Sequence, residues 1–334
     1  MKKLLALLLS VLMLTALLAG CAQGGTNAGK DAEKPTLALV VAGTFGDRSF
    51  YDSSREGCDR LASEGAVTLK TIECNNEQHT QQMRNAADAA DIVVLVGWEF
   101  YDVETVAPEY PDVRFIWIDN ATSAPVENVL CITYAQNEGS FLAGYVAAKL
   151  SQTGVIGAVG GEDSDTINDF IVGYRQGAAY ADPNVKVEVQ YANTYDDPTV
   201  GKDCALALHE KQADVIFQIA SKTGDGVFEA ARAGGFYAIG VDSDQKYIAD
   251  DVIVCSMCKQ VGQSIYDAVK QYLDKGDDCG LFGTTWVADM RSGLVGLGYG
   301  EEGSTQQVSQ ELKDQVADLA QKIISGEIQV DTTR

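Results

Sequence analysis

Two kinds of hydrophobic pattern alternate along this chain. Short apolar runs rich in Val and Ile separate stretches in which apolar residues recur every three or four positions. Residues 91–97 form a continuous apolar run, which is typical of a strand buried on both faces. Residues 51–63 and 138–151 have the helical spacing. This alternation predicts an α/β protein with parallel sheets and helices on both faces of each sheet.

The pattern occurs twice, so we expect two doubly wound parallel-sheet lobes joined by a hinge. Expected strands cover residues 37–42, 67–74, 91–97, 114–119 and 129–134 in the first set, and 155–159, 185–192, 215–220, 237–241 and 252–256 in the second. Residues 285–297 look extended and 307–324 helical, and these last segments are expected to cross between the lobes. Ligands of such sheets bind at the carboxyl ends of the strands.

The expected organisation has four parts. Residues 1–20 are a signal peptide and 21–34 a tether. Residues 35–150 form an N-terminal lobe that is completed by about 260–290. Residues 151–259 form a C-terminal lobe that is completed by about 291–334. This division fits the usual size of domains, about 150 residues each.

The N-terminus has the pattern of a lipoprotein signal. Lys2 and Lys3 precede an apolar run at 4–17 that is too short to span a bilayer, and small residues lead directly to Cys21. This pattern predicts cleavage before Cys21 and attachment of lipid to its thiol, so the chain is expected on the extracytoplasmic face of the cell membrane. The alternative is an ordinary secretory peptide in which Cys21 is incidental.

Charge excludes one class of partner. The chain has 25 Lys and Arg against 48 Asp and Glu, a net charge of −23. Its one basic cluster is Lys2-Lys3, inside the predicted signal peptide. Nucleic acid is therefore not expected as a partner.

Candidate catalytic and metal-binding residues are scarce. The chain has only two histidines, His79 and His209, and lacks a G-x-S-x-G elbow, an H-E-x-x-H motif and clustered metal ligands. Cys255 and Cys258 have redox spacing, but they lie in a strand run rather than at a helix start, where a thiolate would be stabilised. We therefore expect no enzymatic activity, no cofactor and no metal.

Four motifs resemble one family along nearly the whole chain after the signal. They are D-R-S-F at 47–50 with Glu56-Gly57, E-G-S-F-L-A-G-Y-V-A-A at 138–148, Y-A-I-G-V-D-S-D-Q at 237–245, and V-C-S-M-C-K at 254–259. They resemble the basic membrane proteins, which are lipoprotein substrate-binding components of ABC importers and include purine-nucleoside receptors. The resemblance implies a type I periplasmic-binding-protein fold, a small ligand between the lobes and an ABC permease as partner. A monomer is the default for such a binder.

The resemblance also implies ligand contacts. In the nucleoside receptors two aromatic rings stack on the base, and an aspartate with a lysine holds the ribose hydroxyls. Phe50 matches the first ring and Tyr195 falls where the second is expected. Asp242 matches the aspartate and Lys259 the lysine, while Ser221 matches a glycine of the family. Such rings bury a base favourably, and a carboxylate can accept from both hydroxyls of a diol.

The chain departs from the family pattern near the first strand. The family has T-D there, and its aspartate reads the base edge, but this segment is Val40-Val41-Ala42-Gly43 and lacks the carboxylate. Trp98 and Glu99 follow Gly97 at a strand end and are expected to face the ligand. Either Glu99 replaces the missing contact or the ligand is not a purine.

Several alternatives remain open from sequence. Asp47 is expected at the site but could instead cap the following helix, as Asp242 could cap another. Phe50 and Trp98 could be core residues, and Tyr195 and Lys259 could lie on the surface. The ligand could be a sugar, and the protein could be a sensor or surface antigen without a permease.

Overall fold

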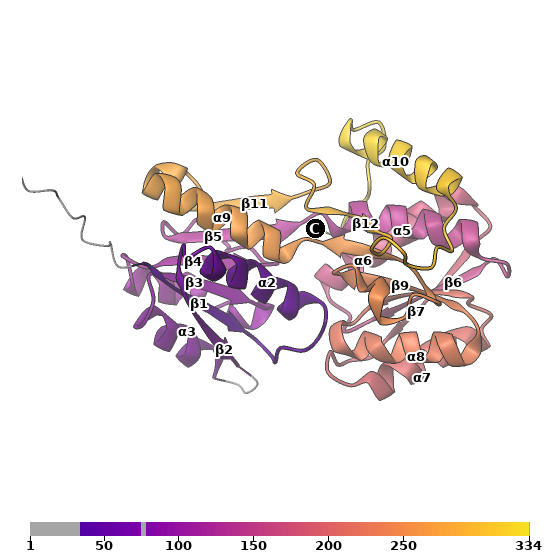
Figure 1. Ribbon diagram of the computed structural model, residues 1–334, viewed down its shortest axis with the longest axis horizontal. Helices are drawn as coiled ribbons and strands as arrows, with labels where there is room; N and C mark the ends of the chain where they lie inside the picture. The colour runs from indigo at the N-terminus through magenta and orange to yellow at the C-terminus, as the bar shows by residue number, and fades with distance from the viewer. Residues whose placement is uncertain (1–33, 75–77, 334) are drawn as a thin grey trace, which may run out of the picture. The chain divides into compact units, whose positions relative to one another are not determined.

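A computed structural model describes residues 34–74 and 78–333. The predicted signal peptide, Cys21 and the tether up to residue 33 lie outside these residues. Pro35–Arg334 forms one compact unit, which contains two six-stranded sheets (Figure 1). We call each sheet with its packed helices a lobe. Among the described residues, no helix combines the length and the apolar character that a membrane span requires.

The first sheet is parallel throughout, in the order β11-β5-β4-β3-β1-β2. Its strands are β1 (Thr36–Val41), β2 (Thr68–Glu73), β3 (Ile92–Val96), β4 (Arg114–Ile118), β5 (Val129–Tyr134) and β11 (Thr284–Ala288). All five residues of β3 are buried, as its apolar run predicts. The helical elements of this lobe are α2 (Phe50–Ser63), α3 (His79–Ala87), η1 (Trp98–Phe100), α4 (Val103–Val106), η2 (Ala107–Glu109), α9 (Val261–Lys275) and η5 (Gly276–Cys279).

The second sheet repeats this order as β12-β10-β9-β8-β6-β7, with only β12 antiparallel to its neighbour. Its strands are β6 (Val155–Gly160), β7 (Lys186–Tyr191), β8 (Val215–Ile219), β9 (Tyr237–Asp242), β10 (Ile253–Lys259) and β12 (Val295–Gly298). Its helical elements are α5 (Gln136–Leu150), α6 (Asp165–Ala181), α7 (Pro198–Glu210), η3 (Ser221–Gly224), α8 (Asp225–Gly234), η4 (Gln245–Ile248) and α10 (Gln310–Ile324). The expected α/β class with two doubly wound sheets is confirmed.

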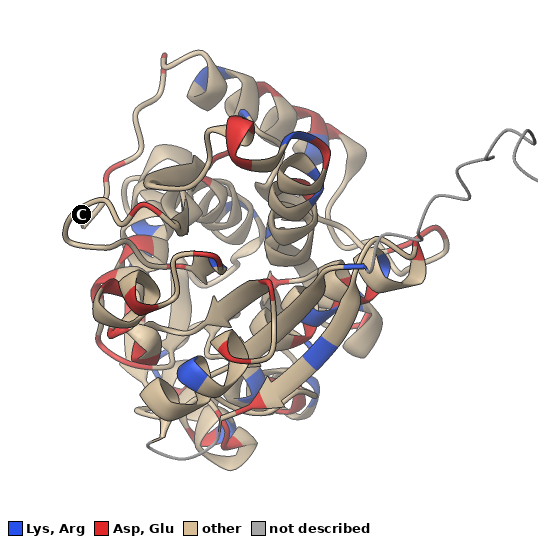
Figure 2. Ribbon diagram, turned by 90° about the vertical axis from the view of Figure 1, so that its left-hand side faces the viewer, with Lys and Arg blue, Asp and Glu red and all other residues tan. Residues whose placement is uncertain are grey.

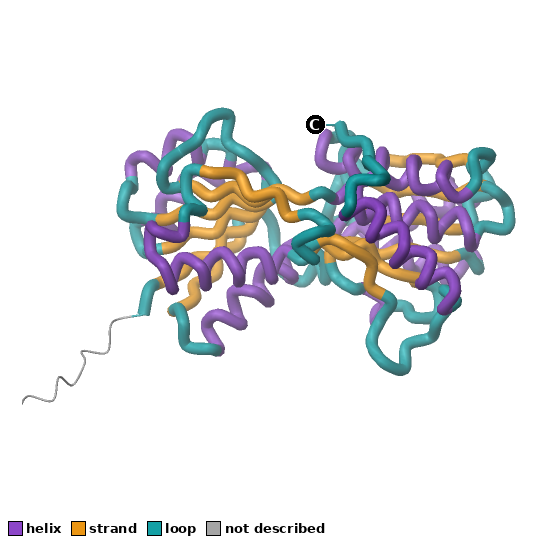
Figure 3. The backbone as a smooth tube through the Cα atoms, turned by 90° about the horizontal axis from the view of Figure 1, so that it is seen from above, coloured by secondary structure: helices purple, strands orange, loops and turns teal. Residues whose placement is uncertain are grey.

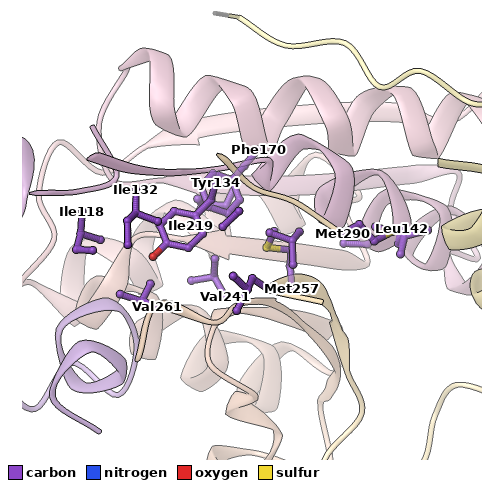
Figure 4. Close-up of a cluster of buried hydrophobic side chains, with 14 of the residues drawn as sticks. Ile118, Ile132, Tyr134, Leu142, Phe170, Ile219, Val241, Met257, Val261 and Met290 are labelled. Atoms are coloured by element: carbon purple, nitrogen blue, oxygen red, sulfur yellow. The ribbon is translucent and has the colours of Figure 1, made fainter. Parts of the chain in front are cut away.

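Helices cover both faces of each sheet (Figure 3). One hydrophobic cluster is shared by the two lobes and includes residues of α2, α5, α6 and α9. In Figure 4, Ile118 and Ile132 of the first sheet and Ile219, Val241 and Met257 of the second belong to this cluster. Separate clusters lie under α3 and α4 in the first lobe and under α7 and α8 in the second. The shared core therefore fixes the sheets' carboxyl ends near each other.

The chain passes between the sheets three times, from β5 to α5, from β10 to α9 and from β11 to β12. The expectation that residues 285–297 form an extended segment is wrong. A turn separates β11 from β12, with Asp289 and Ser292 hydrogen-bonded to each other and Gly293 at a φ of 76°. That positive φ is accessible to glycine at little cost, so the chain turns there and passes into the second sheet.

Two further sequence features have structural outcomes. Cys255 and Cys258 lie buried within β10 as free thiols, and burial raises the pKa of both, which disfavours the reactive thiolate. Acidic positions are spread over helices and loops, with Lys and Arg scattered among them in the view of Figure 2.

Candidate ligand-binding pocket

A pocket of about 470 Å³ lies at the carboxyl ends of strands from both sheets. Both sheets have the 2-1-3-4-5 order of doubly wound folds, in which ligands bind at this edge. The pocket is lined by Phe50, Tyr51, Gly97, Trp98, Glu99, Asp119, Asn120, Glu162, Ser164, Asp165, Thr166, Ile167, Phe170, Tyr195, Ile219, Ser221, Val241, Asp242 and Lys259. Seven of the eight predicted ligand contacts are therefore brought together, and Asp47 is the exception.

Three pocket residues other than glycine have left-handed backbone conformations. Asp119, Ser221 and Asp242 have φ values of 69°, 49° and 63° and lie where β4, β8 and β9 end. Such conformations cost about 1–3 kcal/mol each and persist where the surrounding structure enforces them, most often at functional sites. Their clustering at one cavity makes it the candidate functional site.

Lys259, the last residue of β10, forms ion pairs with two carboxylates of the pocket. Its Nζ is 2.7 Å from Oδ2 of Asp119 and 3.8 Å from Oδ1 of Asp242, and the residue is only 2% exposed. The same Nζ lies 4.8 Å from the ring centroid of Phe50 and 5.3 Å from that of Phe170. One buried cation therefore joins two carboxylates beside aromatic faces.

One carboxylate oxygen of Asp242 already accepts a hydrogen bond within the protein. Ser49 Oγ donates to its Oδ2 at 2.5 Å, while its Oδ1 faces Lys259. Burial raises the pKa of Asp242 to about 6, and the charges of Asp47 and Asp119 add to the rise, while Lys259 and Ser49 oppose it. At neutral pH the ionised carboxylate can accept a hydrogen bond from a hydroxyl group.

Glu99 supplies a further hydrogen-bond acceptor in the pocket lining. Its Oε2 is buried without a hydrogen-bond partner, and a Cβ at Gly97 would lie only 2.5 Å from that oxygen. Gly97 has a φ of 132°, so both its conformation and its lack of a side chain make room for this carboxylate. Burial raises the pKa of Glu99, with a further contribution from Glu162.

Aromatic rings form much of the remaining wall. Trp98 is 57% exposed, which places its indole at the open side of the pocket rather than in the core. A Cβ at Gly161 would overlap the ring of Tyr195, so this ring lies directly against the backbone after β6. The ring of Tyr51 covers Gly43, in the segment that lacks the family's T-D.

Asp47 lies behind the pocket wall. Its carboxylate accepts hydrogen bonds from the backbone N–H groups of Ser49, Tyr51 and Asp52 and from Ser221 Oγ at 2.8 Å. Burial raises the pKa of Asp47, and these four bonds oppose the rise. The structure therefore gives Asp47 the capping role that the sequence left as its alternative, together with a bond to Ser221.

Sequence reasoning missed several pocket residues. Asp119 directly follows the apolar run of β4, and that position at a strand end could have identified it. Glu162 follows Gly161 in the corresponding place after β6. Phe170 lies within α6 among residues of core type, so no local signal distinguishes it.

Comparison with known proteins agrees with this architecture. Residues 34–334 match the family described as ABC transporter substrate-binding protein PnrA-like. The chain is 31% identical to basic membrane protein A of Borreliella burgdorferi, over 98% of this chain and 96% of that one. It is 32% identical to basic membrane protein A2 of Borrelia garinii subsp. bavariensis, over 88% and 87%.

Solved structures give the same result. An ABC transporter solute-binding protein from Aeropyrum pernix superposes with a TM-score of 0.81 at 26% identity, covering 90% of this chain and 94% of that one. One from Conexibacter woesei superposes with a TM-score of 0.72 at 24% identity, covering 89% and 99%, and shows the fold. The chain therefore belongs to the PnrA-like family of ABC transporter substrate-binding proteins, which bind small-molecule ligands and work with ABC permeases.

Proposed function

We propose that this protein captures a nucleoside in the pocket and presents it to an ABC permease. The observation that carries the proposal is the cluster of Lys259, Asp119 and Asp242 beside the ring of Phe50. A nucleoside needs both parts, because its ribose offers a cis-diol and its base offers a flat face.

The ribose end is assigned to Asp242 and Lys259. Asp242 Oδ1 accepts from the diol hydroxyls, since Oδ2 is already bonded to Ser49. Lys259 lies beside this oxygen and favours the ionised carboxylate. Ser221, the first residue of η3, also lines the pocket.

The base end is assigned to Phe50, Tyr195, Trp98 and Glu99. The rings bury the faces of the base, and offset or edge contacts between rings add about 0.5–1.5 kcal/mol each. Glu99 accepts from an N–H donor of the base through its unpartnered Oε2. Five carboxylates and one lysine line the pocket, so an uncharged nucleoside fits it better than a phosphorylated one.

The remaining assignments concern the cell. We propose that Cys21 carries the lipid after cleavage of residues 1–20, that the protein works as a monomer on the extracytoplasmic face of the membrane, and that it binds its ligand without chemical change. Loss of labelled palmitate incorporation in Cys21→Ser would support the lipid anchor, and unchanged labelling would contradict it.

The test is titration of the purified protein with guanosine, 2′,3′-dideoxyguanosine, guanine and arabinose, by calorimetry and tryptophan fluorescence. Guanosine should bind best, and loss of the diol should weaken binding at least tenfold. The exposed Trp98 should supply the fluorescence change, so Trp98→Phe should remove it while the buried Trp117 and the half-buried Trp286 remain. Preference for arabinose would replace the nucleoside with a sugar, and no binding of any probe would contradict the proposal.

Asp242→Ala and Phe50→Ala should each weaken guanosine binding by about 1.5–3 kcal/mol without unfolding the protein. Asp196→Ala is the matched control, because the Asp196 side chain is 72% exposed and is not among the residues that line the pocket. Unchanged affinity in either pocket variant would remove that residue from the site.

A further inference from the structure

Each residue of the segment Asp47–Ser49, in the first lobe, contacts the second lobe. The contacts are Ser221 Oγ to Asp47 Oδ2 at 2.8 Å, the ion pair of Arg48 with Asp225, Gln245 Nε2 to the Arg48 carbonyl at 3.0 Å, and Ser49 Oγ to Asp242 Oδ2 at 2.5 Å. These three consecutive residues thus contact the first residues of η3, α8 and η4 and the last residue of β9.

The segment is held in shape by its own lobe. The Asp52 carboxylate accepts from the N–H groups of Gly46 and Arg48, each at 2.8 Å. Gly46 and Arg48 have φ values of 94° and 53°. The positive φ of Arg48 is unusual for a residue with a side chain, so the fold enforces this conformation.

The contacts end at the pocket itself. Ser49 binds one oxygen of Asp242 and leaves the other facing Lys259. Ser221 lines the pocket and donates to Asp47. Ligand-binding groups of the second lobe are therefore oriented by the first lobe, and only while the lobes are together.

We infer that Asp47–Ser49 is a latch that holds the two lobes together over the pocket and orients Asp242 toward the ligand. The inference rests on the proposed function, because it assigns the latch to the pocket described there. Closure of lobes around a ligand is a hinge motion, and contacts made only in the closed state slow its reversal. The latch therefore governs mainly the dissociation rate of the ligand.

The Arg48–Asp225 pair gives the cleanest test, because neither residue is among those that line the pocket. Arg48→Ala and Asp225→Ala should each speed guanosine dissociation about tenfold in stopped-flow fluorescence, with association changed less than threefold. The double variant should be no faster than either single variant. The exchanged pair Arg48→Asp with Asp225→Arg should restore slow dissociation in part.

Arg232→Ala is the matched control. Arg232 pairs with Asp251 at 2.6 Å, and both residues belong to the second lobe. The Arg232→Ala variant should leave the dissociation rate of guanosine unchanged. Unchanged dissociation in Arg48→Ala, or strictly additive effects of Arg48→Ala and Asp225→Ala, would overturn the latch.

Ser49 tests the positioning role. Ser49→Ala should weaken guanosine binding at least fivefold, and Ser49→Thr, which keeps the hydroxyl, should recover most of the affinity. Equal affinity in Ser49→Ala and the unaltered protein would overturn this part of the inference.

Small-angle X-ray scattering separates the latch from the proposed function. With guanosine bound, Arg48→Ala should keep a larger radius of gyration than the unaltered protein. Failure of guanosine to bind the unaltered protein contradicts the proposed function alone. The ligand-free proteins then decide the latch: a larger radius in Arg48→Ala supports it, and equal radii overturn it.

Discussion

Lys259 Nζ lies 2.7 Å from Oδ2 of Asp119, and this buried ion pair joins the end of β10 in the second sheet to the residue after β4 in the first. The two residues are 140 positions apart in the chain. Their side chains are 3% and 12% exposed, so water screens the pair little.

We expect Lys259→Met to lower the free energy of unfolding by about 3–5 kcal/mol at pH 7.5. The variant leaves the buried carboxylates of Asp119 and Asp242 without their shared cation, which costs far more than the ion pair itself contributes. Urea denaturation followed by circular dichroism measures the difference.

The control for this variant is Lys222→Met. Lys222 pairs with Asp196, and their side chains are 40% and 72% exposed, so its loss should cost less than about 1 kcal/mol. Similar losses of unfolding free energy in both variants would show that burial of the Lys259 ion pairs does not make the removal of the lysine more costly.

Asp242→Asn should change the pH dependence of stability. The folded-state pKa of Asp242, about 6, lies above its ordinary value of 3.8, so the fold favours the protonated group. The stability from this group is complete below pH 3.8 and is lost as the pH rises through about 6. Asparagine does not ionise, so between pH 4 and 8 the variant should gain about 3 kcal/mol relative to the unaltered protein.

Unfolding free energies of both proteins at several pH values measure this difference, and parallel curves would contradict it.

The guanosine affinity of the unaltered protein should also depend on pH, in the opposite direction to its stability. Guanosine affinity should fall as the pH drops through about 6, because the protonated carboxyl group loses its charge-assisted hydrogen bonds.

Gly57→Ala should destabilise the protein by about 1–3 kcal/mol, because a Cβ there would overlap the carbonyl of Gly262 where α2 packs against α9. Gly296→Ala is the matched control. No heavy atom lies within 4 Å of a Cβ at Gly296, so the melting temperature of this variant should stay close to that of the unaltered protein. Equal melting temperatures in the two variants would contradict the close approach of the helices.

The sequence predicts most of the fold because many strands, such as β1 and β3, coincide with apolar runs. The exception is the turn at Gly293, where the change of sheet depends on tertiary contacts. Trp98 could be placed at the pocket because it follows Gly97 at the end of such a run, and Asp242 because the family resemblance implies it. The bond between Asp47 and Ser221 could not be predicted, because it spans 174 positions and exists only in the folded chain.

Because β11 belongs to the first sheet, that sheet stays incomplete until late in synthesis. The residues of β11, Thr284–Ala288, pair with β5, yet the ribosome makes them after every strand of the second sheet except β12. Until then β5 has an open edge, which is a template for wrong pairing. A chain that stops before residue 284 lacks an edge strand in both sheets, so premature termination cannot leave either lobe intact.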